Sequence, residues 1–295
     1  MDNFNVYKDI QARTKGEIYI GVVGPVRTGK STFIKRFMEL AVLPAMEDES
    51  LKAVSTDELP QSAGGKTVMT TEPKFIPKEA VQITLGDGIQ AKVRLIDCVG
   101  YMVDGAAGHV ENGEERMVKT PWSEKEIPFT QAAQIGTRKV IGDHSTIGIV
   151  VTTDGSVGEL KRSAYIDAEK QTVDELKKLG KPFILLLNST KPYSDETLKL
   201  AEQLAADYGV TVLPVSCEQL KKEDIFHILE SVLKEFPVTQ LDFHIPKWLE
   251  VLPATHWLKT QVIDMARELL KKVSHMKDAA SQIKTFGGSS GPVEK

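Results

Sequence analysis

A segment of eight residues near the N-terminus has the residue types and spacing that bind phosphate. Residues 24–31 are Gly-Pro-Val-Arg-Thr-Gly-Lys-Ser, a full match to the G-x-x-x-x-G-K-S pattern. Glycines allow backbone N–H groups to turn toward phosphate oxygens, and a helix that begins after the loop adds the positive end of its dipole. Lys30 is expected to reach the β- and γ-phosphates, and the Ser31 hydroxyl is expected to ligate Mg²⁺. The candidate nucleotide-binding residues of this segment are Gly24, Gly29, Lys30, Ser31 and Thr32.

A second motif follows an apolar run. Val93–Asp97 is followed by Cys-Val-Gly100, which gives the D-x-x-G spacing of GTPase-like P-loop proteins. In that arrangement Asp97 would hold Mg²⁺ through water, and the N–H of Gly100 would contact the γ-phosphate. The pattern alone is common, but its position after a P-loop and at the end of a predicted strand makes it specific.

Two neighbouring threonines lie between these motifs, in Lys66-Thr-Val-Met-Thr70-Thr71. GTPase-like proteins need a threonine here that completes the Mg²⁺ shell and contacts the γ-phosphate. Either Thr70 or Thr71 could serve, and the sequence does not choose between them. The alternative is that both are ordinary loop residues.

The residues that would select the base depart from the GTPase pattern. GTPases recognise guanine with N-K-x-D, whose carboxylate accepts hydrogen bonds from N1–H and the amino group. Here a predicted strand ends at Asn188 and continues Ser-Thr-Lys191, so the Asn is kept while the Lys and Asp are missing. Without the carboxylate, polar groups of guanine would be left unpaired, which favours ATP over GTP. Asn188 remains a candidate nucleotide contact.

The residue that would assist hydrolysis also differs. Ras-type proteins place Gln directly after D-x-x-G to orient water, whereas this chain has Tyr101. Arg27, inside the P-loop, could act as an arginine finger in cis and neutralise developing charge. The segment Gly-x-x-Arg-x-Gly-Lys-Ser resembles the P-loop of guanylate-binding proteins and atlastins. The alternative is an arginine that is exposed or ion-paired at the rim of the loop.

These assignments give two sets of candidates. The candidate catalytic residues are Arg27, Lys30, Thr70, Thr71 and Asp97, and the candidate metal ligands are Ser31, Thr70, Thr71 and Asp97.

Strands and helices are expected to alternate along the first 240 residues. Apolar, β-prone runs predict strands at 18–23, 93–97, 147–153, 183–188 and 211–215. Helical patterns occupy 31–43, 166–179, 195–208 and 223–235, with Gly180 and Gly209 where helix ends belong. This alternation predicts an α/β P-loop NTPase with a doubly wound, mostly parallel sheet. Two polar segments, 44–80 and 100–130, are expected to be switch-like loops or plain surface insertions.

The organisation changes near Pro237. Apolar residues from Leu258 to Met276 recur at helical spacing, which predicts an amphipathic helix whose stripe packs in a core or on a membrane or partner surface. We expect residues 1–240 to form the P-loop domain. Residues 241–295 are expected to begin a helical region that a longer chain would continue.

Composition excludes several classes of protein. The 295 residues are 41% hydrophobic and 26% charged, so a large core is feasible and global disorder is not expected. A net charge of −4 argues against a nucleic-acid binder and against binding acidic lipid by bulk charge. No apolar run is long enough to span a membrane, and the N-terminus lacks a signal-peptide pattern. Two distant cysteines, Cys98 and Cys217, argue against a disulfide or zinc scaffold and for a reducing cytosol.

Several longer stretches resemble the stage IV sporulation protein A family, the spore-coat morphogenetic ATPases of endospore-forming Firmicutes. They cover much of the first 190 residues, and the weaker resemblance extends over the whole chain. They are the P-loop with its following Thr-Phe-Ile-Lys, Asp57-Glu-Leu-Pro-Gln-Ser-Ala, Met69-Thr-Thr-Glu-Pro-Lys-Phe, Asp97-Cys-Val-Gly-Tyr, Thr120-Pro-Trp and Ile135-Gly-Thr-Arg-Lys-Val-Ile.

The resemblance implies an ATPase related to translation-factor-like GTPases, with ATP and Mg²⁺ as ligands. ATP hydrolysis in that family drives polymerisation of a static platform, the basement layer of the spore coat, at the forespore outer membrane in the mother-cell cytoplasm. It also implies a small amphipathic membrane-anchoring peptide and other coat morphogenetic proteins as partners. The implied roles fall on Lys30 (P-loop lysine), Thr70 and Thr71 (sensor threonines) and Asp97 (metal-binding aspartate). A regulatory GTPase switch and a structural scaffold with a vestigial P-loop are the alternatives.

Overall fold

The computed structural model describes residues 16–60, 73–84, 90–106, 110–111, 114–279 and 282. The chain divides into two compact units, Met1–Val232 and Leu233–Lys295. Each unit is described by itself below.

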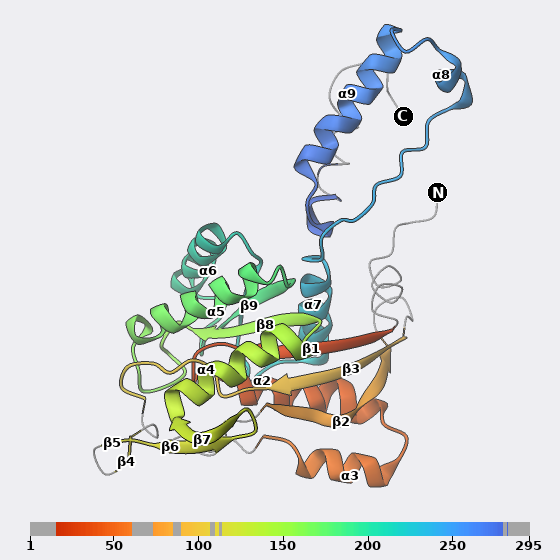
Figure 1. Ribbon diagram of the computed structural model, residues 1–295. Helices are drawn as coiled ribbons and strands as arrows, with labels where there is room; N and C mark the ends of the chain where they lie inside the picture. The colour runs from red at the N-terminus through yellow and green to blue at the C-terminus, as the bar shows by residue number, and fades with distance from the viewer. Residues whose placement is uncertain are drawn as a thin grey trace. The chain divides into compact units, whose positions relative to one another are not determined.

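A six-stranded sheet organises the first unit (Figure 1). The strands in spatial order are β10 (Val212–Val215), β9 (Phe183–Asn188), β8 (Ile147–Thr153), β1 (Glu17–Val23), β3 (Gln90–Asp97) and β2 (Lys74–Thr84). Neighbouring strands are parallel except β2, which runs antiparallel to β3 at the edge. From β1, the chain continues to β3 on one side of the sheet and later to β8 on the other side, because β1 lies between β8 and β3. The direction in which strands are added therefore changes at β1. Ligands of open α/β sheets bind at the carboxyl ends of the strands at such a point.

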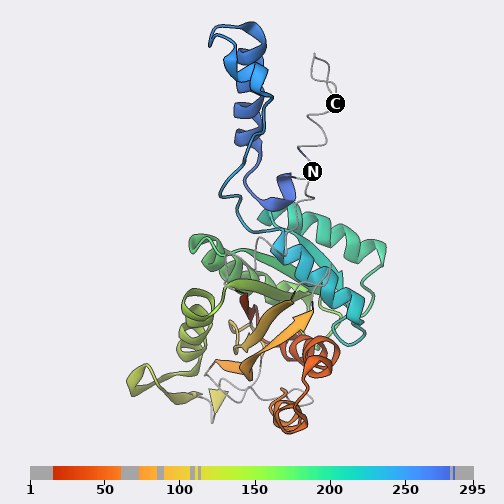
Figure 2. The ribbon, with the colours of Figure 1, turned by 90° about the vertical axis from the view of Figure 1, so that its right-hand side faces the viewer.

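Helices cover both faces of this sheet. One buried cluster joins strand residues to η4 (Val140–His144), which continues α4 (Phe129–Lys139), and to α5 (Ile166–Lys178) and α6 (Asp195–Tyr208). Figure 2 shows α4 on one side of the sheet and α2 (Lys30–Phe37) and α7 (Lys222–Leu233) on the other. Every residue of β8 and β9 is buried, as expected for parallel strands covered on both faces. The sequence prediction of a mixed α/β fold with a mostly parallel central sheet is therefore confirmed.

The element ends also agree closely with the sequence. The expected strands overlap β1, β3, β8, β9 and β10, and three of the expected helices correspond to α5, α6 and α7. Gly209 caps α6 in the left-handed conformation, with φ of 63°, and Gly180 follows α5 with φ of 62°. Glycine adopts these angles without the steric cost of a Cβ atom.

The two polar segments contain more regular structure than the sequence suggested. In the first, α3 (Glu49–Asp57) is capped by Asp48, whose side chain accepts hydrogen bonds from the N–H groups of Ser50 and Leu51. That segment also includes most of β2, whose register with β3 shifts between Ile76 and Val81. The second contains two hairpins, β4 (Val110–Glu111) with β5 (Glu114–Glu115) and β6 (Met117–Thr120) with β7 (Ser123–Pro128). These elements were not predicted, because an irregular edge strand and very short hairpins lack a clear hydrophobic period; the expectation of switch-like loops or surface insertions stays a prediction.

The second unit contains two helices between two paired backbone segments. In this pairing, Val238 N–H donates to Ser274 O (3.0 Å) and Met276 N–H donates to Phe236 O (3.0 Å). Between them lie α8 (Lys247–Val251) and α9 (Trp257–Lys272). Among the described side chains of α9, Leu269 is the one that is buried. In the predicted stripe, Leu269, Val273 and Met276 are buried and Leu270 is exposed, so the described residues support core packing for the C-terminal end of the stripe.

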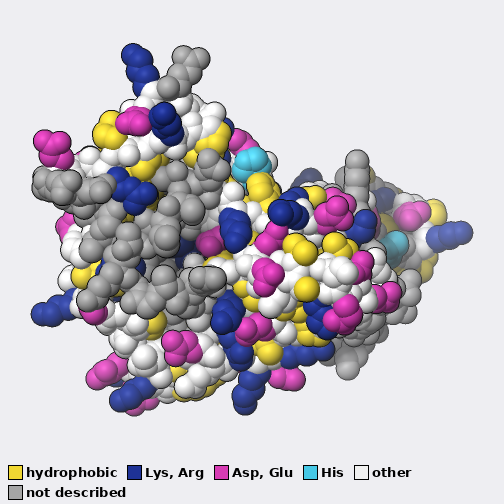
Figure 3. Space-filling view, turned by 90° about the horizontal axis from the view of Figure 1, so that it is seen from below, with side chains coloured by type: hydrophobic (Ala, Val, Ile, Leu, Met, Phe, Trp, Pro, Cys, Tyr) yellow, Lys and Arg dark blue, Asp and Glu magenta, His cyan; other side chains and the backbone are white. Residues whose placement is uncertain are grey.

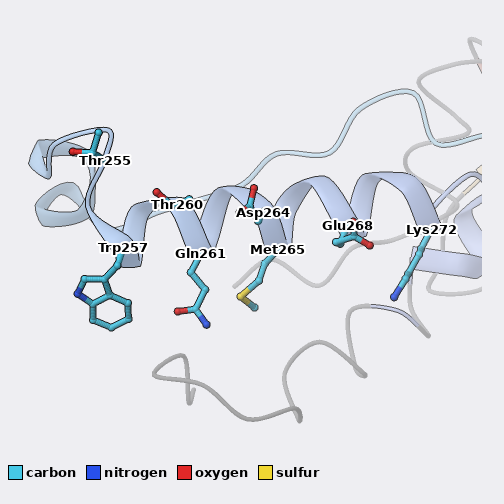
Figure 4. Close-up of a pocket in the computed structure, with 8 residues that line it drawn as sticks. All are labelled: Thr255, Trp257, Thr260, Gln261, Asp264, Met265, Glu268 and Lys272. Atoms are coloured by element: carbon cyan, nitrogen blue, oxygen red, sulfur yellow. The ribbon is translucent and has the colours of Figure 1, made fainter.

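Side chains on one side of α9 form the wall of an open pocket. Figure 4 shows Trp257, Gln261, Met265 and Lys272 projecting from that side. The Trp257 side chain is among the exposed large hydrophobic groups of the chain, at 62%.

The surface seen from below Figure 1 carries charges of both signs. Figure 3 shows Lys and Arg side chains interspersed with Asp and Glu, and hydrophobic groups lie between them. This mixture agrees with the small net charge of −4. Among the helices that the structure describes, none combines the length and hydrophobicity needed to span a membrane.

Candidate nucleotide-binding site

The P-loop connects the carboxyl end of β1 to α2, and its shape depends on glycine. Gly24 has φ of +132°, and a Cβ atom there would lie 2.4 Å from Val151 O. Gly29 has φ of +97°, and a Cβ atom there would lie 2.3 Å from Asn188 Nδ2. Both positions therefore exclude any side chain, because real Cβ contacts are not this short and positive φ angles strain L residues. The G-x-x-x-x-G spacing has a direct steric cause.

Lys30 lies inside this loop. Its side chain is buried, and Nζ donates to Pro25 O (2.6 Å) and Gly24 O (3.3 Å). Burial lowers the pKa of the ammonium group, while the nearby Cys98 and Asp97 oppose that shift. Among the residues that the structure describes, no side chain caps the start of α2 at Gly29, and the first N–H groups of a helix, here including those of Ser31 and Thr32, form an anion-binding site. A positive side chain and a helix N-terminus thus meet in one loop.

Asp97 and Ser31 form an oxygen pair beside the lysine. The Ser31 hydroxyl donates to Asp97 Oδ2 at 3.4 Å, and Oδ1 is buried without a hydrogen-bond partner among the described residues. Burial raises the pKa of Asp97 to about 6, while Lys30 opposes the rise. An unpaired buried carboxylate oxygen next to a hydroxyl is a donor set that fits Mg²⁺, which prefers oxygen ligands. These two side chains therefore fit the expected metal.

The D-x-x-G segment docks directly on the P-loop. Gly100 has φ of +91°, and a Cβ atom there would lie 2.0 Å from Gly24 O and 2.7 Å from Lys30 Nζ. The N–H of Val26 donates to the carbonyl of Tyr101 at 2.9 Å. The two motifs, separated by about 70 residues in the sequence, are thus in backbone contact.

Tyr101 occupies the position after this motif, and its side chain is buried. It is 1% exposed and belongs to an apolar cluster with Val26, Val103, Tyr165 and others. Burial raises the pKa of its phenol to about 12, with Glu175 adding to the rise. A side chain enclosed in this way cannot orient a water molecule at the nucleotide, which agrees with the expectation that Tyr101 does not replace a catalytic glutamine.

Asn188 braces three loops at the carboxyl ends of the strands. Its Nδ2 donates to Thr28 O in the P-loop (2.9 Å), and its Oδ1 accepts from Cys217 N–H after β10 (3.0 Å). The side chain is 2% exposed. Sequence reasoning named Asn188 as a nucleotide contact and missed this bracing role. The available signal was a polar residue at the end of an otherwise apolar buried strand.

The remaining candidates are placed less centrally. Arg27 is partly exposed and adopts φ of 63°, and its charge acts on Tyr165, whose pKa is raised by burial and lowered by the guanidinium. Thr32 lies in the first turn of α2 and is partly exposed. Thr70 and Thr71 lie outside the described residues, so the choice between them stays open. Asp154 and Gly155 form a turn, in which Asp154 Oδ1 accepts from Ser156 N–H (2.9 Å).

A buried ion pair near the end of β8 was not expected. Glu169 is fully buried, and both its oxygens contact Arg162, at 2.6 and 2.7 Å. Tyr208 donates to the same carboxylate at 2.9 Å, and the Thr152 hydroxyl also bonds to it. Arg162 further donates to Thr153 O at 3.2 Å, which joins the approach to α5 to the strand beside the P-loop. The two residues are seven apart in the continuous segment formed by η5 (Arg162–Tyr165) and α5, and the sequence analysis did not identify the pair.

Comparison with known proteins places the chain in a family. Residues 1–237 match the description "Stage IV sporulation protein A, ATPase domain", and residues 238–291 match "Stage IV sporulation protein A, middle domain". The chain is 48% identical over 286 residues to stage IV sporulation protein A of Bacillus subtilis (strain 168), which covers 97% of this chain and 58% of that protein.

Two further relatives give the same result. Stage IV sporulation protein A of Bacillus anthracis is 49% identical over 94% of this chain and 56% of its own length. The protein of the same name from Clostridioides difficile (strain 630) is 49% identical over 96% of this chain and 58% of its own. The chain thus spans somewhat more than half the length of these relatives. With the P-loop geometry, these matches show that the chain belongs to the stage IV sporulation protein A family and contains its ATPase domain.

Proposed function

We propose that this chain binds Mg²⁺ and ATP and hydrolyses ATP with water as the nucleophile. The observation that carries the proposal is the junction of Lys30, Asp97 and Gly100. A buried lysine, a carboxylate oxygen with no hydrogen-bond partner among the described residues, and a glycine in close contact with the P-loop converge there. Such a concentration of buried polar groups is costly for folding and is typical of a functional site.

The residues of the site have different proposed roles. The P-loop amides and Lys30 bind the phosphates, whereas Ser31 and Asp97 hold Mg²⁺, together with Thr70 or Thr71. The metal would neutralise charge on the phosphate oxygens. Arg27 is our candidate for an arginine finger in cis, because it lies in the P-loop and is partly exposed. We expect slow turnover, since Tyr101 is buried and leaves the position after D-x-x-G without a water-orienting side chain.

The wider role follows from the family. We infer a translation-factor-related P-loop ATPase whose turnover drives assembly of copies of the chain into a polymer, the basement layer of the spore coat. Its proposed location is the mother-cell cytoplasm at the forespore outer membrane, with a small amphipathic membrane-anchoring peptide and other coat morphogenetic proteins as partners. The matches to relatives named stage IV sporulation protein A support this role.

The test measures phosphate release and sedimentation in the same samples. Wild-type protein is expected to release phosphate from ATP and to pellet in a nucleotide-dependent manner. Lys30→Ala should abolish nucleotide binding, and Asp97→Ala should weaken Mg²⁺-dependent hydrolysis. Normal hydrolysis by both variants would contradict the proposed site. Turnover without nucleotide-dependent pelleting would leave an ATPase and remove the assembly role for this chain.

The same samples decide between the alternatives. A regulatory GTPase would hydrolyse GTP in preference to ATP, and a scaffold with a vestigial P-loop would sediment equally with and without nucleotide.

A further inference from the structure

Helix α3 turns apolar side chains toward solvent. Leu51 and Val54, which lie three residues apart on one face of the helix, are 54% and 49% exposed. The residue of α3 that is buried is Ser55, which is polar. A helix that packs only on its own domain shows the opposite arrangement, with apolar residues inside. Leu51 and Val54, called the α3 knob below, are therefore a candidate contact surface.

A groove of about 430 Å³ lies at the opposite edge of the sheet, beside β10. Its lining comes from the turn before α6, α6 itself, β10 and α7, and includes Tyr193, Leu198 and Ile228. Tyr193 is 78% exposed. An exposed aromatic side chain at an apolar pocket is typical of a contact point between proteins. Of the candidate nucleotide-binding residues that the structure describes, none lines this groove, called the β10 groove below.

The knob and the groove belong to opposite edges of one sheet. α3 contacts β2 at one edge, α6 packs against β10 at the other, and Figure 1 shows the two helices at opposite ends of the first unit. The six strands, about 4.8 Å apart, separate β2 from β10 by roughly 24 Å, so one copy cannot fill its own groove. Two copies can make the contact, and each then keeps one unused surface. Such a heterologous contact continues from copy to copy.

Direct pairing of strands is disfavoured at both edges. The carbonyls of Thr211 and Val215 accept hydrogen bonds from β9, so the backbone of Pro214, between them, faces outward. Proline has no N–H to donate, and β2 carries Pro77 within its register shift. Prolines and irregularities at sheet edges oppose the addition of another strand. Docking of a helix in the groove needs no backbone donor at the edge.

The charges beside the two surfaces are complementary. The charged side chains that line the groove are Lys221, Asp224 and His227. Asp224 accepts a hydrogen bond from Lys221 N–H (2.8 Å) at the start of α7, where it offsets the positive end of the helix dipole. The Lys221 side chain is exposed. Three consecutive exposed acidic residues, 47–49, precede the knob, against one lysine in α3, Lys52. A contact that places the start of α3 beside Lys221 therefore pairs opposite charges.

Both surfaces adjoin segments that are expected to respond to nucleotide. In the sequence, α3 lies a short distance before Thr70 and Thr71, the candidate sensor residues. The groove lining includes Ser216, next to Cys217, whose N–H donates to the side chain of Asn188 behind the P-loop. A contact between these surfaces would therefore depend on the state of the nucleotide site.

We propose that the α3 knob of one copy docks in the β10 groove of a second copy, and that this contact is the repeating interface of the polymer. Leu51 and Val54 enter the groove beside Tyr193, and the acidic start of α3 faces Lys221. This inference rests on the proposed function, since it identifies the surfaces by which copies of the chain assemble.

The test is sedimentation velocity of the whole chain with Mg²⁺ and ATP. Leu51→Asp disrupts the knob, and Leu198→Asp disrupts the groove. Each should raise the protein concentration needed for assembly by at least about tenfold, because a charge replaces a leucine that the contact buries. Leu179→Asp is the matched control, because Leu179 is 49% exposed at the end of α5, outside both surfaces, and this variant should assemble as the wild type does. Thermal unfolding and titration with a fluorescent ATP analogue check that each variant folds and binds nucleotide.

A mixture of the two variants tests the pairing itself. Leu51→Asp keeps its groove and Leu198→Asp keeps its knob, so an equimolar mixture should form heterodimers and nothing larger. A two-fold contact, or a partner other than a second copy, would give no such heterodimer. Wild-type assembly by either folded variant, or a mixture without heterodimers, would overturn this inference alone. If the wild type does not assemble with ATP, the proposed assembly role fails and this inference fails with it. If Leu198→Asp unfolds, Tyr193→Asp replaces it.

Discussion

Replacing Asn188 with alanine should destabilise the protein even when no nucleotide is present. The substitution removes the donor to Thr28 O and the acceptor for Cys217 N–H, and both bonds are buried. Each buried partner left unsatisfied costs about 1–3 kcal/mol, so the two together cost about 2–6 kcal/mol. For a unit of this size, that loss should lower the melting temperature by roughly 5–20 °C.

The assay is thermal and urea unfolding of wild type and Asn188→Ala, each with and without Mg²⁺ and ATP. Thr190→Ala is the control, because that side chain is exposed and lies two residues away. It should change the free energy of unfolding by no more than the roughly 0.5 kcal/mol typical of surface substitutions.

The unfolding of the nucleotide-free protein separates the two roles of Asn188. A residue that only contacts nucleotide would leave the nucleotide-free protein unchanged and reduce only the stabilisation by ATP. If Asn188→Ala unfolds with the wild-type midpoint in the absence of nucleotide, the bracing role that we assign to this side chain is wrong.

Three single substitutions and one double variant test the packing around the site. Gly100→Ala should weaken ATP binding in a titration, because its Cβ would lie 2.0 Å from Gly24 O and the positive φ alone costs about 1–3 kcal/mol. Wild-type affinity in this variant would show that the D-x-x-G segment moves freely. Tyr101→Gln should lower the melting temperature without speeding phosphate release, since the amide would be buried in an apolar cluster. Faster phosphate release by this variant would mean that position 101 does face the nucleotide. Arg162→Met should cost about 3–5 kcal/mol in urea unfolding, because Glu169 would keep a buried charge without its partner. Adding Glu169→Gln should recover part of that loss, and no recovery would count against the ion pair as the cause.

The sequence by itself determined the fold class and the order of its main elements. Continuous apolar runs such as Phe183–Asn188 predict strands covered on both faces, and the structure buries every residue of that strand. The P-loop and D-x-x-G motifs were recognisable because glycine and lysine at fixed spacing reflect local backbone requirements. Gly24 and Gly29 illustrate this, since their positive φ angles are properties of single residues.

The edge of the sheet was less predictable. In β2, the register shift after Ile76 breaks the alternation that identifies a half-buried strand. The hairpins between residues 110 and 128 are too short to produce a hydrophobic period. β2 pairs with β3, and β6 and β7 contact α4, and these tertiary contacts are information that no local window contains.

Only the tertiary structure decided how the chemical groups meet. The sequence identified Lys30 in the P-loop and Asp97 and Asn188 at strand ends, but folding determines which atoms they contact. Asp97 Oδ1 is buried with no hydrogen-bond partner in the part of the chain that the structure describes, and burial raises the pKa of Asp97, while the amide of Asn188 joins three loops. The burial of Glu169 was likewise not predicted: Arg162 is only seven residues away, but the contacts of the carboxylate with Thr152 and Tyr208 form only once α5, α6 and β8 pack together. Residue type sets which chemistry is available, and long-range packing sets the distances and desolvation that make it specific.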